Sequence, residues 1–205
     1  MTTSTLTPVR APQGALLVAA VWLGLAILAG ATGALIRLPF PGPQLIIFTL
    51  FGATFGATLG IPAWRAWVQA LPLRLLIGIN ALRFVGISFL VLAARGQLAP
   101  VFADRAGWGD IAVAIVALLL LAAGDPRTRL HRGIIHVWNA FGVLDLIVAV
   151  ATATAVTLRG SVPGIAPLLS LPLVVVPTFF VPLFVANHVI IFLGLRAGAR
   201  AGHGH

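Results

Sequence analysis

The chain has no cysteine, lysine, glutamate or tyrosine, and it is poor in charge. The missing cysteine excludes disulfides, thiolate metal sites, iron–sulfur clusters and thiol redox chemistry. The missing lysine excludes a retinal Schiff base and other lysine-based covalent reactions. Only 8% of the 205 residues are charged and 60% are apolar, whereas about 25% of the residues in a soluble domain are charged. Too little polar surface remains to cover a water-soluble globule, so the composition predicts an outer surface that faces lipid.

The charges that are present are almost all arginines. The net charge is +9 and the mean hydropathy is +1.10. In a soluble protein this excess of positive charge would suggest a nucleic-acid partner. Here the arginines stand singly between apolar runs, which is how topology is set in a membrane protein. We therefore expect the lipid bilayer as partner and no nucleic acid.

Apolar runs of about 20 residues, the length that crosses the hydrocarbon core of a bilayer, recur along the chain. They predict an all-α polytopic membrane protein, a bundle of about six transmembrane helices in a single domain covering residues 1–205. Residues 1–12 and 197–205 are expected to be flexible tails. The first run is too long for the core of a signal peptide, so we expect an uncleaved first helix. The predicted spans are 14–36, 44–62, 74–94, 109–124, 133–158 and 170–195.

The arginines are unevenly divided between the two sides of these spans. The side that holds both termini carries eight, namely Arg10, Arg65, Arg74, Arg127, Arg129, Arg132, Arg196 and Arg200. The other side carries four, namely Arg37, Arg95, Arg105 and Arg159. Because cytoplasmic loops are enriched in arginine, both termini are expected in the cytoplasm.

The second predicted span contains a local repeat, Phe-Gly-Ala-Thr-Phe-Gly-Ala-Thr, that places Gly52, Gly56 and Gly60 on one helix face. Small residues at this spacing let two helix backbones approach closely in lipid. An internal helix–helix contact is one interpretation. A seam with a second copy or a membrane partner is the other.

The last predicted span carries Pro172, Pro177 and Pro182 at five-residue spacing. An interior proline removes a backbone hydrogen bond and favours a kink. The kinked helix either lines a cavity or is simply bent, and the sequence leaves both interpretations open.

Two charged residues are predicted near the middle of the membrane. Arg83 lies about nine residues into the third span, and Asn80 lies one turn before it on the same face. Asp145 lies about twelve residues into the fifth span and is the only acid that we expect inside any span. Both charges fall near the bilayer midplane at a rise of about 1.5 Å per residue. The sequence predicts an Arg83–Asp145 ion pair, which either specifies helix packing or forms part of a working site.

A second polar group is predicted nearer the cytoplasmic face. It comprises His136 and Asn139 at the start of the fifth span, and Asn187 and His188 in the last third of the sixth. Two histidines on neighbouring helices can ligate haem iron or another metal. Isolated histidines more often donate hydrogen bonds across a helix interface. No cofactor or metal is therefore predicted, and haem or metal ligation by His136 and His188 remains an alternative.

Signatures of membrane enzymes are missing. The sequence has no His-Glu-x-x-His zinc motif and no phosphate-binding loop. The acids at Asp104 and Asp110 are expected to be a loop charge and the N-cap of the fourth span. We therefore predict that the protein is not an enzyme.

Four segments resemble small bacterial multi-pass membrane proteins of unassigned function. They are Arg83-Phe-Val-Gly-Ile-Ser-Phe-Leu, the stretch from Leu98 to Asp110, Trp138-Asn-Ala-Phe-Gly-Val-Leu-Asp145, and the proline-rich segment from Leu171 to His188. The resemblance spans roughly residues 74–195. It implies a bacterial inner-membrane protein and no particular activity.

Two classes of function remain open at this point. In the first, the protein handles a proton, an ion or a small solute through a polar intramembrane cluster of Arg83, Asp145, Asn80, Asn139, His188, Asn187 and His136. In the second, it is a structural or accessory subunit of a larger membrane complex, and Gly52, Gly56 and Gly60 pack against a partner. Mutation of the Arg83–Asp145 pair distinguishes a structural role from a functional one.

Overall fold

The computed structural model describes residues 14–126 and 128–201, and all regular structure in them is helical. Five helical stretches are long and apolar enough to cross a membrane, which is the build of a membrane-embedded protein. The N-terminal helix is apolar but shorter, with 17 residues. The five long stretches are Gly42–Gly60, Leu73–Ala94, Pro100–Ala122, Arg129–Leu158 and Val176–Arg196.

These stretches are assembled from α-helices joined, in three places, by turns of different pitch. A 3₁₀ segment interrupts the stretch Leu73–Ala94, and π-helical segments occur near the start of Pro100–Ala122 and at the start of Val176–Arg196. Such segments inside α-helices often mark functional sites. In chain order the elements are α1 (Ala15–Ala31), α2 (Ala34–Arg37), α3 (Gly42–Gly60), α4 (Pro62–Gln69), α5 (Leu73–Ile79), η1 (Asn80–Val85), α6 (Gly86–Ala94), α7 (Pro100–Phe102), η2 (Ala103–Gly107), α8 (Trp108–Ala122), α9 (Arg129–Leu158), η3 (Ala166–Leu169), η4 (Val176–Phe180) and α10 (Val181–Ala201).

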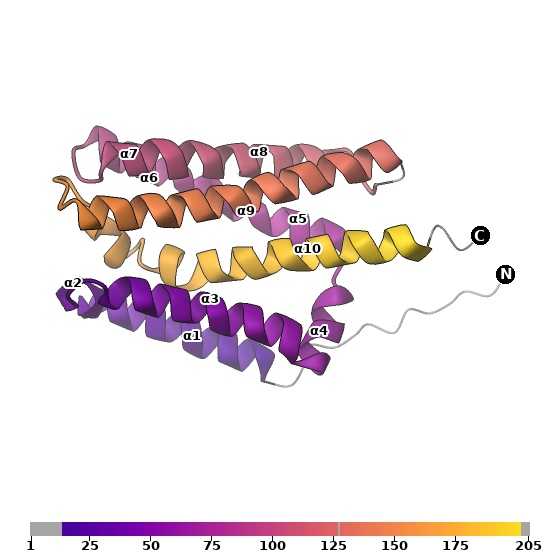
Figure 1. The fold of residues 1–205 in the computed structure, drawn as a ribbon, viewed down its shortest axis with the longest axis horizontal. Helices are drawn as coiled ribbons and strands as arrows, with labels where there is room; N and C mark the ends of the chain where they lie inside the picture. The colour runs from indigo at the N-terminus through magenta and orange to yellow at the C-terminus, as the bar shows by residue number, and fades with distance from the viewer. Residues whose placement is uncertain (1–13, 127, 202–205) are drawn as a thin grey trace.

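The long helices run side by side along the longest axis of the molecule (Figure 1). Helix α10 has a central place, because it packs against α3 and α4 on one side and against α5 and α9 on the other. Helix α8 packs against η1 and α9, and α1 and α3 lie at the far edge of the bundle, where α1 contacts α2 and η4. The chain thus forms a four-helix unit, α5–α6, α7–α8, α9 and α10, with α1 and α3 attached through α10 and η4.

The outer surface of the bundle is apolar. Large aliphatic side chains are exposed on α1, α3, α5, α6, α8 and α9, for example Leu16 at 74%, Leu119 at 62% and Val137 at 72%. In water this surface would be costly to expose. Lipid tails are as apolar as these side chains, so the surface can face the interior of a bilayer without this cost.

The predicted helix positions agree with the structure for the second, third and fifth spans and differ elsewhere. The fourth span begins at Pro100 rather than 109, because the stretch expected to be a polar loop continues the helix through α7 and η2. The last span begins at Val176 rather than 170. The first is broken at Gly33, whose φ of 67° is left-handed.

Only part of the two predicted tails falls within the residues that the structure describes. The tail of residues 1–12 lies outside the described residues. From residue 197, where a flexible tail was expected, helix α10 continues to Ala201. Residues 202–205 lie outside the description.

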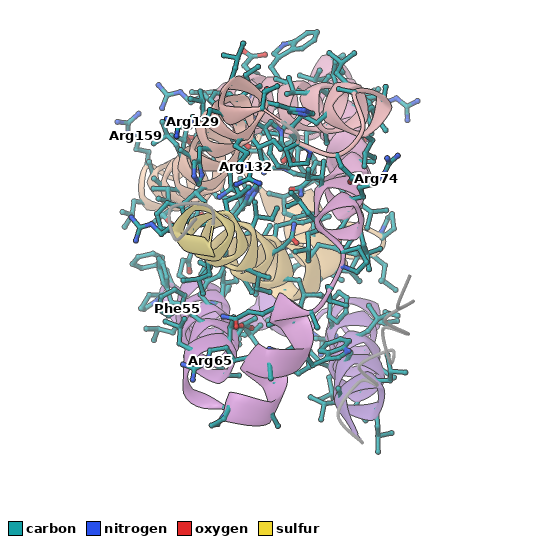
Figure 2. All side chains as sticks on the ribbon, turned by 90° about the vertical axis from the view of Figure 1, so that its right-hand side faces the viewer. Phe55, Arg65, Arg74, Arg129, Arg132 and Arg159 are labelled. Atoms are coloured by element: carbon teal, nitrogen blue, oxygen red, sulfur yellow. The ribbon has the colours of Figure 1, made fainter. Side chains whose placement is uncertain are left out.

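Most of the arginines lie at the two ends of the bundle. Arg65, Arg74, Arg129 and Arg132 belong to the end at which α4 lies, which faces the viewer in Figure 2. Arg37, Arg95, Arg105 and Arg159 belong to the opposite end. Arg83 is the exception, since it lies between the ends.

The glycine face of α3 does not pack inside the described chain. A Cβ atom placed on Gly52, Gly56 or Gly60 would find nothing within 4 Å. An internal helix–helix contact through these glycines, one of the two interpretations of the repeat, is therefore wrong. Helix α3 instead meets the rest of the bundle through its other faces, where Thr58 is buried.

Candidate functional site

Arg83 lies at the centre of the four-helix unit and is completely buried. Its Nε donates to Oδ1 of Asp110 over 2.6 Å, and its Nη2 donates to Oδ2 of Asp145. Its Nη1 donates to the carbonyl of Gly142 over 3.2 Å and lies 3.4 Å from Nε2 of His188. The ring of Phe184 lies 5.8 Å from the guanidinium carbon. Helices α8, α9 and α10 thus all contribute a group to one arginine.

The local structure around Arg83 brings α8 unusually near. Arg83 stands in η1, and Gly86 follows at the start of α6. A Cβ atom on Gly86 would lie 2.6 Å from the carbonyl oxygen of Gly107 and 2.8 Å from Cβ of Asp110. Real Cβ atoms do not approach other atoms so closely, so only glycine permits this helix contact. The contact brings Asp110 within reach of Arg83.

Two further glycines make room for the other polar partners. A Cβ atom on Gly109 would overlap the carboxylate of Asp145. A Cβ atom on Gly142 would overlap the imidazole of His188. Small residues on α8 and α9 therefore make the space that Asp145 and His188 occupy beside Arg83.

His188 is held in one orientation by Asn139. The amide nitrogen of Asn139 donates to the backbone carbonyl of His188 over 2.9 Å, so its Oδ1 faces the imidazole as an acceptor. Nδ1 of His188 lies 2.8 Å from that oxygen and donates to it. Nε2 is left without a proton and faces Arg83 as an acceptor. The arrangement describes a neutral imidazole, because a second ring proton would point at a guanidinium.

Asn80 and Asn187 meet at a different point, one turn from the arginine. Both side-chain amides donate to the carbonyl of Leu76, over 3.0 Å and 2.9 Å. The Oδ1 atoms of both residues are buried without a hydrogen-bond donor in the described structure. Asn187 thus ties α10 to α5, Asn80 bonds within its own helical stretch, and neither is hydrogen-bonded to Arg83.

The predicted residues are therefore only partly brought together. The Arg83–Asp145 ion pair is confirmed, and Asn139 and His188 join it. His136 lies apart, against the ring of Phe192 at 6.0 Å between centroids.

Asp110 is a residue that the sequence interpretation missed. It was expected to cap a helix, but no side-chain cap is formed there, and it is buried with 8% exposed. Expecting Asp145 to be the only acid inside a span was therefore wrong. The surrounding Gly-Trp-Gly-Asp looked like a loop because glycines and charges cluster there. The signal in its favour was the pair Ala103 and Gly107, two small residues four positions apart, which is the spacing of close helix contacts.

The charges of the cluster do not balance. Asp110 and Asp145 supply two carboxylates against one guanidinium, and His188 is neutral. No other described charged side chain pairs with them. An uncompensated charge in a low-dielectric interior is costly, so one further positive charge, a proton or a cation, belongs to the site.

Hollows approach the cluster from both ends of the bundle. A cavity of about 80 Å³ between α3 and α9 has Asp110 in its wall. A second hollow of about 250 Å³, at the end where α4 lies, is lined by Leu76, Ile190 and Ile191. Leu76, whose carbonyl accepts hydrogen bonds from Asn80 and Asn187, is among the residues that line that second hollow.

Haem or metal ligation by His136 and His188 does not fit this geometry. Both ring nitrogens of His188 already face protein partners. The two histidines also point into different surroundings, one toward Arg83 and the other toward Phe192. Among the described residues, no group of three or more histidines and acids is placed to hold a metal ion.

The sequence model of a protein family described as "Domain of unknown function (DUF8737)" matches residues 39–196. The chain belongs to the DUF8737 family. No curated protein and no solved structure matches the chain. The DUF8737 region contains Arg83, Asp110, Asp145, His188 and the rest of the cluster, as well as both hollows. Helix α1 lies outside it.

Proposed function

We propose that this DUF8737 protein is a six-span protein of the bacterial inner membrane with both termini in the cytoplasm. The five long helices and α1 supply the spans, since 17 helical residues reach about 26 Å and α2 extends the segment. The arginine excess at the α4 end supports a cytoplasmic assignment for that end. The resemblance to small bacterial multi-pass proteins supports the location.

The function we propose is the binding and release of a proton at the Arg83–Asp110–Asp145 cluster, coupled to movement of an ion or small solute. The observation that carries it is the charge balance of two carboxylates on one guanidinium. A proton on either carboxylate makes the cluster neutral. When that proton leaves, a cation must take its place or the helices must rearrange.

The surroundings of the cluster support exchange with both sides of the membrane. Asp110 borders the hollow between α3 and α9, and Leu76 borders the hollow at the α4 end. The 3₁₀ segment that carries Arg83, with the π-helical segments η2 and η4, places irregular pitch in three of the helices around the site. Ionisable residues inside membranes commonly mark proton and ion pathways.

Infrared spectroscopy of the protein in nanodiscs tests proton binding directly. The C=O stretch of a protonated carboxyl should change with pH and should be lost in Asp110→Asn or Asp145→Asn. The control is Asp125→Asn, because Asp125 is exposed outside the spans. A protein whose carboxyl band never changes with pH, or changes only in Asp125→Asn, contradicts the proposal.

A structural or accessory role is the second candidate, and one observation favours it. The glycine face of α3 is smooth, outward-facing and unused by the described chain. A partner helix or a second copy would fit there. The native mass of the purified protein distinguishes this role, since a bound subunit adds mass and a lone chain does not. An absorption spectrum of the same sample would reveal haem brought by such a partner.

A further inference from the structure

The cavity that borders Asp110 continues into a groove on the outside of the bundle. The walls of the cavity come from α3, α6, α9 and the segment around η3 and η4. Phe48, Leu146, Val150 and Thr154 also line the groove between α3 and α9, which has a volume of about 570 Å³. Because α3 and α9 are joined mainly through α10, this groove opens sideways toward the lipid. An apolar molecule can therefore reach Asp110 from within the membrane.

The polar groups of this cavity supply negative charge and hydrogen-bond acceptors, and the amide of Gln44 also carries N–H donors. Asp110 supplies a carboxylate, of which Oδ1 is used by Arg83. Gln44 supplies a buried Oε1 atom that no described donor reaches. The hydroxyl of Thr154 already donates to the carbonyl of Val150. No arginine or histidine is among the described residues that line the cavity. The site therefore offers acceptors and negative charge within an apolar wall.

We propose that the cavity binds an amphipathic organic cation, with its ammonium group at Asp110 and its apolar body in the groove between α3 and α9. This inference rests on the proposed function, because it identifies the cation that replaces the proton of the cluster. Acceptor oxygens select a head group that carries N–H donors and positive charge. The apolar walls select a hydrocarbon or aromatic body.

The proton and the organic cation each neutralise the same surplus negative charge of the cluster. The charged or titratable groups that face Asp110 are Arg83 from η1 and Asp145 from α9, and His188 from α10 faces Arg83. With both acids ionised, one positive charge is missing, and either particle supplies it. Binding of the organic cation therefore displaces one proton, and the two particles exchange one for one.

The test compares three probes of equal length, decylammonium, decanol and decanoate, with the full chain in nanodiscs of zwitterionic lipid. Binding is followed as the rise in Tm with probe concentration, since a ligand of the folded state stabilises it. Decylammonium should bind at least about tenfold more tightly than decanol, and decanoate should not bind. Decylammonium should also release protons into unbuffered solution.

Two variants locate the binding. Ala153→Leu fills the cavity wall without touching the charges and should weaken decylammonium binding about tenfold or more. Ala140→Leu is the matched control, because Ala140 is on the same helix but exposed. Asp110→Asn should abolish the preference for decylammonium over decanol.

Equal binding of decylammonium and decanol to the wild-type protein would overturn the inference, because the cavity would then be an apolar space only. Unchanged binding in Ala153→Leu would overturn it as well, because the cation would bind elsewhere. Either result leaves the infrared test of the carboxyl groups unaffected. Failure of this inference is thus distinguishable from failure of the proposed function.

Discussion

The four-helix unit and the α1–α3 pair of the same molecule are built on different principles. In the most apolar stretch of α10, 56% of the residues are buried, against 11% in that of α3. The four-helix unit holds Arg83, Asp110, Asp145 and His188 in direct contact, whereas α1 and α3 hold no charged residue at all. Where lipid supplies no hydrophobic force between helices, polar contacts and close glycine packing specify the assembly. Helices α1 and α3 have few of either, and α3 borders a cavity instead.

Removal of the central arginine should have the largest effect on the four-helix unit. Arg83→Gln leaves two buried carboxylates without their cation, so we expect a loss of about 3–5 kcal/mol in the free energy of unfolding. Denaturation in mixed micelles measures it. The double variant Arg83→Gln/Asp145→Asn removes one surplus charge and should recover part of the loss. A double variant less stable than either single variant would contradict the proposed charge balance.

The glycine packing of the unit is the next most sensitive feature. Gly142→Ala places a methyl group in the space of the His188 ring and should cost about 1–3 kcal/mol. Gly133→Ala on the same helix is the matched control, since its Cβ would meet nothing within 4 Å. The control should be neutral or stabilising by about 1 kcal/mol. Equal effects of both variants in the same denaturation assay would show that His188 is not held where the structure places it.

Simple physical rules applied to the sequence predicted the long helices and the ion pair. Hydropathy and length located the five long helices, and the cost of charge in lipid singled out Arg83 and Asp145. Asp110 was missed because glycines and charges cluster near the start of its helix, and this local pattern is typical of a loop. The local pattern was given more weight than hydropathy and length. The start of the last span was missed for a related reason. Pro172 was counted within a long apolar run, but the helix begins only at Val176.

What the sequence could not supply was which helices are neighbours. Arg83 and Asp110 are 27 positions apart, and Arg83 and His188 are 105 apart. Nothing in a single chain's hydropathy says that α10 passes between α3 and α9. For the same reason the outward direction of the α3 glycines was not readable. A small-residue face predicts close packing and does not name the partner.

Helix α1 is attached to the four-helix unit mainly through η4, and one contact of this attachment can be removed singly. Nε1 of Trp22 in α1 donates to the carbonyl of Thr178 in η4 over 2.8 Å, and its ring lies 4.9 Å from that of Phe179. Trp22→Phe keeps an aromatic ring and loses the donor, so we expect a loss of about 0.5–1.5 kcal/mol. Limited proteolysis should show earlier cleavage between α1 and α3. A loss as large as that of Arg83→Gln would mean that α1 is as tightly integrated as the helices of the four-helix unit.

No loss of stability in the isolated chain is expected from changes on the glycine face of α3. A Cβ atom on Gly56 would meet nothing within 4 Å, so Gly56→Leu should be neutral or stabilising by up to about 1 kcal/mol. The contrasting variant is Gly86→Ala, whose Cβ would lie 2.6 Å from the carbonyl of Gly107, and which should cost about 1–3 kcal/mol.

The native mass of the Gly56→Leu variant then separates the two functional classes. If the wild-type protein carries a partner that Gly56→Leu sheds while its stability is unchanged, the face is an interface and the accessory role gains its partner surface. If the mass is that of a single chain in both proteins, the face is in contact with lipid. A leucine at position 56 is then solvated by lipid as well as the aliphatic side chains around it. The function of the protein in that case lies in the cluster around Arg83.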